Sequence, residues 1–262
     1  MTENGASADK IQLTYNGVTS EYPVLIGTDG ASSIDFSTLT KQTGLTSLDY
    51  GFVNTASTKS KITYIDGEQG ILRYRGYPID QVATKLSFLQ TAYLLIYGEI
   101  PTENELEHFE YQIQRHSLLH EDLKNFFSGF PRNAHPMPVL SAGVSALSTY
   151  YEDSLDPKNP EHVELATYRL LAKVPVMASY AHKKSIGQAF LYPKNDLGYV
   201  ENFLRLTFGN RAEEYELNPV VVKALERLLI LHEDHEQNAS TSTVRLVGST
   251  DANLFEIGRA HV

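Results

Sequence analysis

Two histidines stand at the end of an apolar run and are followed at once by amide and hydroxyl side chains. The run covers residues 225–231, and His232 and His235 come directly after it. Because residues i and i+3 are neighbours on a helix, we expect both rings on one helix face. Beyond the expected helix end come one amide and several hydroxyls: Asn238, Ser240, Thr241, Ser242 and Thr243. This arrangement favours a site for a small anionic ligand.

Two other interpretations of this segment stay open at this point. The His-x-x-His spacing differs from the i, i+4 zinc-binding pattern, and no third ligand is recognisable, so we predict no metal site. The histidines can also be structural groups at a helix end beside a Ser/Thr loop, and the chemistry alone slightly favours that view. A histidine that binds a carboxylate in a cleft would contribute ~1.5–3 kcal/mol.

A second group of residues combines cationic and aromatic side chains. Arg169 and Lys173 lie four positions apart, so they project from the same side of a helix. Two like charges there are unfavourable unless an anion or a carboxylate lies between them, and a phosphate-bearing ligand would suit. The other members lie earlier in the chain: Arg115, His116, Ser117, Leu118 and Tyr151. Without further support, a solvated helix face is the simpler interpretation.

Composition excludes several classes of protein. The 262 residues carry a formal net charge of −10, which argues against a general nucleic-acid-binding or acidic-membrane-binding surface. There are no cysteines, so disulfides and thiolate sites are excluded, and a reducing cytoplasm fits. No apolar run approaches the ~20 residues of a membrane helix. The Gly-rich dinucleotide, P-loop and nucleophile-elbow patterns are also missing.

Hydrophobic periodicity predicts a mainly α fold with a small β-rich N-terminal segment over residues 1–77. Asn16-Gly17 between alternating apolar runs indicates a hairpin over residues 11–24, and a second pair is expected at 61–65 and 71–77. Residues 78–255 are expected to be helical, with a break over 131–138 and a kink near Lys173 caused by Pro175. The expected helices cover residues 79–86, 88–97, 102–114, 122–127, 139–151, 161–181, 199–208 and 219–235.

Several long segments at consistent spacing resemble the citrate synthase family, specifically its large, NADH-regulated bacterial type. The resemblance covers residues 11–255 and is carried by four blocks: 65–79, 169–173, 185–197 and 230–245. It implies condensation of oxaloacetate with acetyl-CoA to citrate and free CoA, without a cofactor. His235 would bind oxaloacetate, with His232 as its supporting neighbour and Asn238 completing the contacts.

The resemblance also implies regulation and assembly. The NADH-inhibited subtype uses an Arg-His-Thr-Met segment, a tyrosine, and an arginine and lysine four apart. These match Arg115, His116, Ser117, Leu118, Tyr151, Arg169 and Lys173, with two small members changed. Ala212 stands where the subtype has a reactive cysteine. The expected partners are oxaloacetate and acetyl-CoA, with NADH as an allosteric inhibitor, in a cytoplasmic dimer or hexamer that binds neither nucleic acid nor membrane.

The sequence departs from the family in one respect. We find no Gly-Pro-x-His-Gly-Gly segment, no Gly-His-Arg segment and no later catalytic aspartate, so we assign no catalytic residue. We expect an N-terminal part of the large helical domain, inactive by itself, and a non-native tail at residues 256–262 that a sequencing adapter would encode. A 2-methylcitrate synthase, or a non-catalytic domain that binds oxaloacetate or NADH, remain the alternatives.

Overall fold

The computed structural model describes residues 9–27 and 31–259, and its contacts divide the chain into two compact units, residues 1–60 and 61–262. In the first unit, β1 (Lys10–Tyr15), β2 (Val18–Ile26) and β3 (Ser32–Ile34) form an antiparallel sheet in that order, followed by α1 (Leu39–Thr43). Asn16 and Gly17 have φ of 50° and 76°, the left-handed pair that a tight hairpin turn needs. The first predicted hairpin is therefore confirmed.

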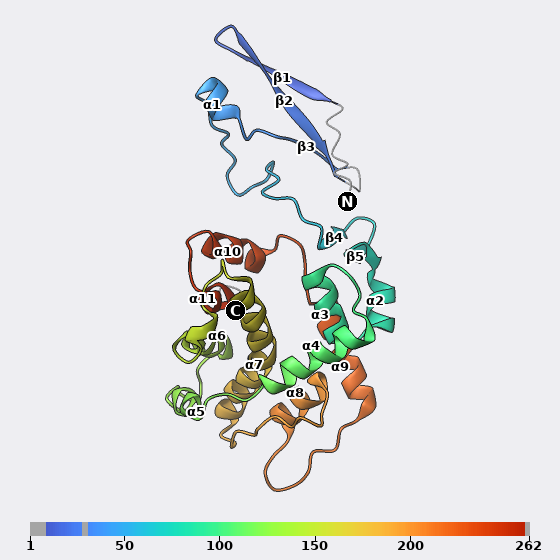
Figure 1. Ribbon diagram of the computed structural model, residues 1–262, viewed down its shortest axis with the longest axis vertical. Coiled ribbons are helices and arrows are strands. Elements are labelled where there is room, and N and C mark those ends of the chain that lie inside the picture. The colour runs from blue at the N-terminus through green and yellow to red at the C-terminus, as the bar shows by residue number, and fades with distance from the viewer. Residues whose placement is uncertain (1–8, 28–30, 260–262) are drawn as a thin grey trace. The chain divides into compact units, whose positions relative to one another are not determined.

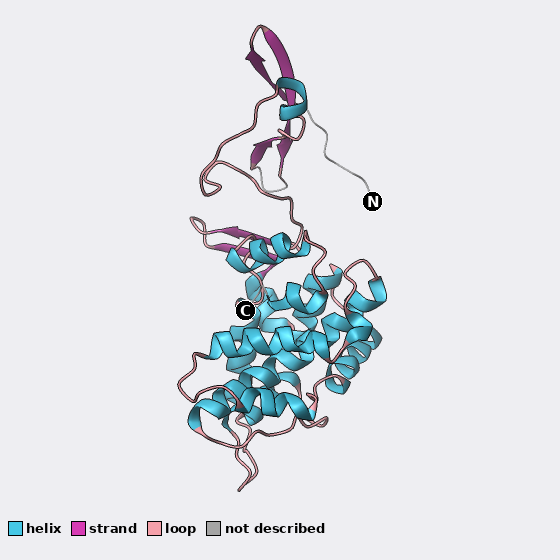
Figure 2. Ribbon diagram, turned by 90° about the vertical axis from the view of Figure 1, so that its left-hand side faces the viewer, coloured by secondary structure: helices cyan, strands magenta, loops and turns pink. Residues whose placement is uncertain are grey.

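The second unit opens with a small sheet, and strands elsewhere in the described chain are confined to the first unit (Figure 2). It contains β4 (Thr63–Asp66), β5 (Ile71–Tyr74) and β6 (Tyr77–Pro78), all antiparallel. The extended run predicted over 71–77 is interrupted, because Arg75 and Gly76 adopt φ of 50° and 90° and reverse the chain. Beyond residue 78 all described elements are helical, which agrees with the predicted change of character after residue 77.

The helices follow the local signals in the sequence closely. After α2 (Ile79–Lys85), both α3 (Phe88–Tyr97) and α4 (Glu103–Arg115) begin with reciprocal capping boxes, Ser87 with Gln90 and Thr102 with Glu105. Gly98 ends α3 in the left-handed conformation. The next elements are α5 (Glu121–Ser128), α6 (Pro136–Ala146), η1 (Leu147–Thr149), η2 (Glu152–Ser154), α7 (Pro160–Ile186), α8 (Tyr199–Phe208), α9 (Pro219–Leu231), α10 (Ala239–Gly248) and α11 (Leu254–Arg259).

Both boundaries of α6 and the end of α7 differ from the expectation. The break predicted over residues 131–138 ends early, because the His135 side chain accepts from the Met137 N–H and Pro136 occupies the first turn of α6. That helix also stops at Ala146, and a 3₁₀ turn follows. In contrast, α7 runs five residues past its predicted end at Ala181, through Pro175, to a left-handed Gly187. The mainly helical fold class is confirmed.

The core of the helical unit is built around α7, which packs against α4, α5, α6, α8 and α11 (Figure 1). In its main cluster Phe127 from α5 and Met177 from α7 both pack against α6 at Gly143, and both side chains are fully buried. Among the described residues, no helix combines the length and apolar character that would let it cross a membrane.

One glycine controls how closely α6 approaches its neighbours. A Cβ atom on Gly143 would lie 2.8 Å from Phe127 Cζ and 3.2 Å from Met177 Sδ, both in the fully buried core. Close-packed interiors accommodate extra atoms only by displacing side chains from their preferred positions. Helix packing at this point therefore requires a residue without a side chain.

We predict that Gly143→Ala lowers the free energy of unfolding by about 1–3 kcal/mol, because overpacking outweighs the gain in helix propensity. Gly248→Ala in α10 is the matched control, since its new Cβ would be 3.8 Å from Ile257 Cδ1, an ordinary contact. That variant should be stabilised by about 0.5–1 kcal/mol. Chemical denaturation of both variants measures the difference, and an equal response of the two would contradict the packing argument.

Candidate functional site

The predicted anion site lies in the turn between α9 and α10. Helix α9 ends at Leu231, and His232 caps it, so His232 and His235 do not share a helix face as expected. The turn nevertheless keeps the two rings together, with centroids 6.0 Å apart and planes at 56°. Both side chains are exposed. The two rings therefore lie close together because the chain turns after α9, and not because they are three positions apart on a helix.

The β4–β5 hairpin braces this turn. The buried Tyr74 hydroxyl lies 3.0 Å from the Ile230 carbonyl oxygen and 3.1 Å from that of Asp234, and it accepts from the Asp234 N–H at 3.3 Å. The Glu236 carboxylate accepts from the Ile65 N–H at 2.6 Å, and Glu236 itself adopts a left-handed φ of 57°. The second hairpin thus determines the path of the chain that carries both histidines.

The hydrogen bonds of His232 decide which of its nitrogens is available. Its Nδ1 lies 2.7 Å from the Leu228 carbonyl oxygen, one of the free carbonyls at the end of α9. Since a carbonyl only accepts, Nδ1 carries the proton, and Nε2 of the neutral ring is left as an acceptor. A histidine in this state orients the turn and can receive a proton or hydrogen bond from a neighbour.

The hydroxyl-rich segment is the first part of a helix rather than a loop. Asn238 is the N-cap of α10, and its Oδ1 accepts from the Thr241 N–H at 2.8 Å. The four predicted loop residues therefore lie in α10, because a strong N-cap outweighs their weak helix propensity: Ser240, Thr241, Ser242 and Thr243. The start of α10 brings the positive end of a helix dipole close to the histidines in sequence.

Between the two histidines lies a buried acid that sequence reasoning missed. Both carboxyl oxygens of Glu233 are inaccessible to solvent and have no hydrogen-bond partner among the described residues. Burial, with a smaller contribution from the charge of Asp234, raises the pKa of Glu233 to about 9. This side chain is therefore a neutral acid at neutral pH, and no residue pattern in the sequence distinguished it from its exposed neighbours.

The second predicted set is brought together on the side of α7. The Tyr151 ring centroid lies 4.4 Å from the Arg169 guanidinium carbon and 4.9 Å from Lys173 Nζ. The carboxylate expected between like charges comes from Asp153, which pairs with both terminal nitrogens of Arg169 at 2.6 and 3.0 Å. Arg169 also donates to Ser154 Oγ. Asp153 was not predicted, because nothing in its local sequence marks it as a partner.

The rest of this set forms the turn after α4. Lys173 is almost fully buried and donates to the carbonyl oxygens of His116 and Leu118, the latter at 2.7 Å. Burial, together with the charge of Arg169, lowers the pKa of Lys173 to about 7. Burial also lowers the pKa of His116, with contributions from both cations. The solvated-face interpretation of Arg169 and Lys173 is thus wrong, since both side chains are buried.

Two members of the set lie at its edge. The exposed Arg115 contacts the Tyr111 ring at 5.0 Å from its centroid, and Ser117 Oγ donates to the Gln114 carbonyl oxygen at 2.7 Å. The described residues contain no group of three or more His, Cys, Asp and Glu side chains that could hold an ion. The chemistry available at both places is recognition of anions by donors.

We predict that Glu233→Gln is more stable than the parent chain at high pH. The folded-state pKa of about 9 exceeds the ordinary value of 4.5, so between these values only the unfolded chain loses the proton. The parent therefore loses stability as the pH rises from ~5 to ~9, whereas glutamine cannot ionise. Melting temperatures across this range measure the effect, with the exposed Glu216→Gln as control. A difference between variant and parent that does not grow with pH would refute the assignment.

Comparison with known proteins places the chain in a family. Residues 51–258 match the family model described as citrate synthase, C-terminal domain. Citrate synthase 1 of Mycobacterium tuberculosis is 61% identical over 247 residues, which are 94% of this chain and 57% of that protein. Citrate synthase of Corynebacterium glutamicum is 50% identical over 247 residues, 94% of this chain and 56% of the relative. The chain thus spans somewhat more than half the length of these relatives.

Solved structures agree with the sequence comparison. The crystal structure of citrate synthase from Pyrobaculum aerophilum matches with a TM-score of 0.73 and 30% identity, covering 97% of this chain and 58% of that one. Citrate synthase from Thermotoga maritima matches with a TM-score of 0.69 and 28% identity, covering 82% and 55%. The family match includes residues 256–258 of the predicted non-native tail, of which residues 260–262 lie outside the described structure. The chain belongs to the citrate synthase family.

Proposed function

We propose that the whole protein condenses oxaloacetate with acetyl-CoA and water to give citrate and CoA. The observation that carries this proposal is 61% identity, over 94% of the chain, to a protein named citrate synthase 1. Because the chain covers 57% of that relative, the activity is assigned to the whole protein. Its two substrates are proposed from the same family membership, and no cofactor is required in addition.

The α9–α10 turn supplies the proposed contacts to oxaloacetate. His235 is exposed on a turn that Tyr74 and Glu236 hold in place, so its ring is available to a ligand. His232 is oriented by its bond to the end of α9 and acts as the supporting neighbour. Asn238 uses its oxygen for the cap, which leaves its amide N–H groups to donate. Donors at a helix start suit a dicarboxylate.

We predict that His235→Ala in the whole protein raises the KM for oxaloacetate by about tenfold or more and leaves the KM for acetyl-CoA nearly unchanged. The reason is the loss of a hydrogen bond to a charged group, which contributes ~1.5–3 kcal/mol. Thiol release with each substrate varied in turn measures both constants. His108→Ala, an exposed position on α4, is the matched control. An unaltered oxaloacetate KM in His235→Ala would remove this assignment.

We further propose that the protein belongs to the NADH-regulated bacterial type and binds NADH beside Tyr151. Support comes from the proximity of Tyr151, Arg169, Lys173 and the 115–118 turn. Arg169 is already paired with Asp153, so a nucleotide phosphate has to compete with a carboxylate for the same guanidinium. The side chain of Asp153 is 64% exposed, which lets it move away when a phosphate arrives. Asp153 would then set the sensitivity to the inhibitor.

We predict that Asp153→Asn binds NADH several times more tightly than the parent, because an amide competes for Arg169 less strongly than a carboxylate does. Titration calorimetry with NADH measures the change. Glu152→Gln removes the same charge from the adjacent exposed position and should leave the affinity almost unchanged. If Asp153→Asn binds NADH no better than Glu152→Gln, Arg169 does not contact the nucleotide.

Assembly and location follow from the same family membership as proposals. We propose that the whole protein is a homo-oligomer, either a dimer or a hexamer. Leu246 on α10 is 70% exposed, which supports an apolar contact between subunits at that helix. Sedimentation velocity of the whole protein measures the oligomeric state. The absence of cysteine supports a cytoplasmic location, which fractionation of the source cells tests.

A further inference from the structure

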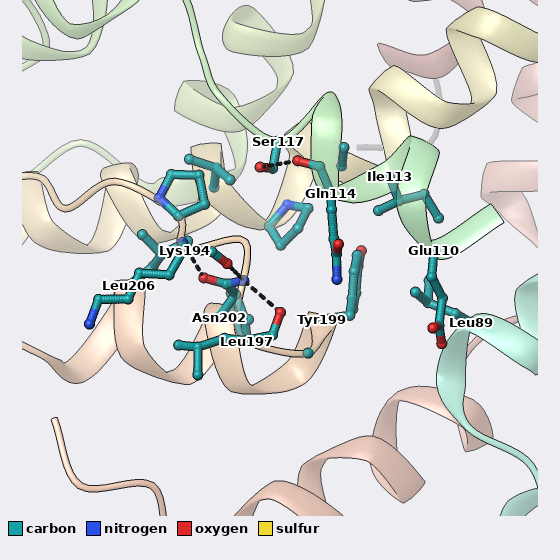
Figure 3. Close-up of a pocket in the computed structure, with 16 residues that line it drawn as sticks. Leu89, Glu110, Ile113, Gln114, Ser117, Lys194, Leu197, Tyr199, Asn202 and Leu206 are labelled. Carbon is teal, nitrogen blue, oxygen red and sulfur yellow. Dashed lines mark hydrogen bonds between the residues drawn. The ribbon is translucent and has the colours of Figure 1, made fainter. Parts of the chain in front are cut away.

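A pocket lies between helices at some distance along the chain from the histidine turn (Figure 3). Its walls come from α3, α4, α7, α8 and the 193–198 loop, and its volume is about 100 Å³. The lining is mainly apolar, with Leu89, Ile113, Ala172, Val176 and Leu206 facing the space. An enclosed apolar cavity of ~150 Å³ holds benzene in other proteins, so this pocket has the scale of a single small ring.

The wall of the pocket is held by hydrogen bonds within the protein. Asn202 on α8 accepts from the Lys194 N–H at 2.9 Å and donates to the carbonyl oxygens of Lys194 and Leu197 at 2.6 and 3.1 Å. Tyr199 donates to the Leu171 carbonyl oxygen at 2.9 Å and stacks on Phe88 with centroids 4.9 Å apart. These contacts anchor the loop and α8, so the pocket is preformed.

Two polar side chains in the lining differ from Asn202 because the described residues offer them no hydrogen-bond or ion-pair partner. Glu110 and Gln114 lie four residues apart on α4, hence on one face. In the described structure, neither the Glu110 carboxylate nor the Gln114 amide has a hydrogen-bond or ion-pair partner, whereas Asn202 is fully used. Figure 3 shows the Gln114 amide extending toward Tyr199, with Glu110 on the side of Leu89.

The acid in the lining, Glu110, has no cation paired with it among the described residues. Glu110 is partly buried, and burial together with the charge of Glu107 raises its pKa. The cation in the lining, Lys194, pairs with Glu214 at 3.1 Å and so does not neutralise Glu110. A solvated acid on an amphipathic helix would face outward, as the exposed Glu107 does. Glu110 instead lines a mainly apolar pocket, where a carboxylate gains most from a ligand that brings a positive charge.

We propose that this pocket binds a small ammonium compound: an apolar ring or short chain that bears one protonated amine. The apolar walls enclose the body, the Glu110 carboxylate accepts from the ammonium group, and Gln114 is placed to accept a second hydrogen bond. The same charge excludes oxaloacetate, acyl-CoA and NADH, all of which are anions. The pocket is therefore distinct from both sites proposed above.

A ligand in the pocket would contact the turn that follows α4. Ser117 lines the pocket, and its neighbours His116 and Leu118 supply the carbonyl oxygens that hold Lys173. Ala172 and Val176 flank Lys173 on α7 and line the pocket as well. A bound amine thus contacts the helix that carries Lys173 and also the turn whose carbonyl oxygens bind it. A ligand here can therefore change the position of Lys173 relative to Tyr151.

Binding of benzylamine to this 262-residue chain tests the proposal directly. Titration followed by two-dimensional ¹H–¹⁵N NMR should show saturable shifts in the millimolar range, with the largest changes at pocket residues such as Ser117, Ala172 and Asn202. Benzyl alcohol should bind more weakly, and benzoate should not bind. These comparisons separate the apolar contribution from the charge contribution without any activity measurement, so the result does not depend on the proposed enzyme.

Substitution of the acid completes the test. Glu110→Gln keeps the shape of the side chain and should weaken benzylamine binding by about tenfold or more. Glu103→Gln makes the same charge change at an exposed position of the same helix, outside the pocket, and should leave binding unaltered. The proposal is overturned if benzylamine shows no saturable shifts in the pocket, if benzoate binds as well as benzylamine, or if Glu110→Gln and Glu103→Gln behave alike.

Discussion

The burial of three cations on α7 is the constraint on which much of the helical unit depends. Arg169, Lys173 and Lys183 are all almost inaccessible, and a buried charge is tolerated only when partners replace its hydration. Each cation obtains partners from a different loop: Asp153 for Arg169, the 116–118 turn for Lys173, and Gln188 with the Gly209 carbonyl oxygen for Lys183. The loops around α7 are therefore positioned by charge satisfaction as well as by apolar packing.

This constraint makes the proposed regulatory region sensitive to small changes. Lys173, with a pKa near 7, is held by backbone carbonyls and lies against the ring of Tyr151, and Arg169 is shared between a carboxylate and the face of the same ring. An anion that approaches Tyr151 enters competition with groups already in place. On the far side of the same turn, the Glu110 pocket has the opposite charge preference. One short segment thus lies between a place suited to anions and a place suited to ammonium groups.

The histidine turn depends on a separate constraint, the reach of one hydroxyl. Tyr74 comes from a hairpin more than 150 residues earlier and contacts the backbone at both Ile230 and Asp234. The fold therefore brings strand β5 to the end of α9, where Tyr74 holds the backbone of the turn that carries His235. Glu233 is buried in the same turn without a partner, which adds a pH-dependent cost to the geometry.

The sequence by itself determined the features that depend on neighbouring residues. Asn16-Gly17 predicted the first hairpin because few other residues adopt two successive left-handed conformations. Thr102 with Glu105 predicted the start of α4, and the blocks of family-like sequence predicted the fold class. The resemblance to the NADH-regulated type named the residues around Tyr151, although it could not show that Arg169 and Lys173 are buried.

Only the tertiary structure decided the features that depend on distant partners. Helix α9 ends before His235 because Tyr74 binds the turn, whereas helical periodicity continued through it. Asp153 neutralises Arg169, and Glu110 stays unpaired. The packing of the helices against one another decides both outcomes, and local spacing in the sequence does not. A charge has the same letter in the sequence whether it is solvated, paired or buried. Its surroundings, and hence its chemistry, are known only once the chain has folded.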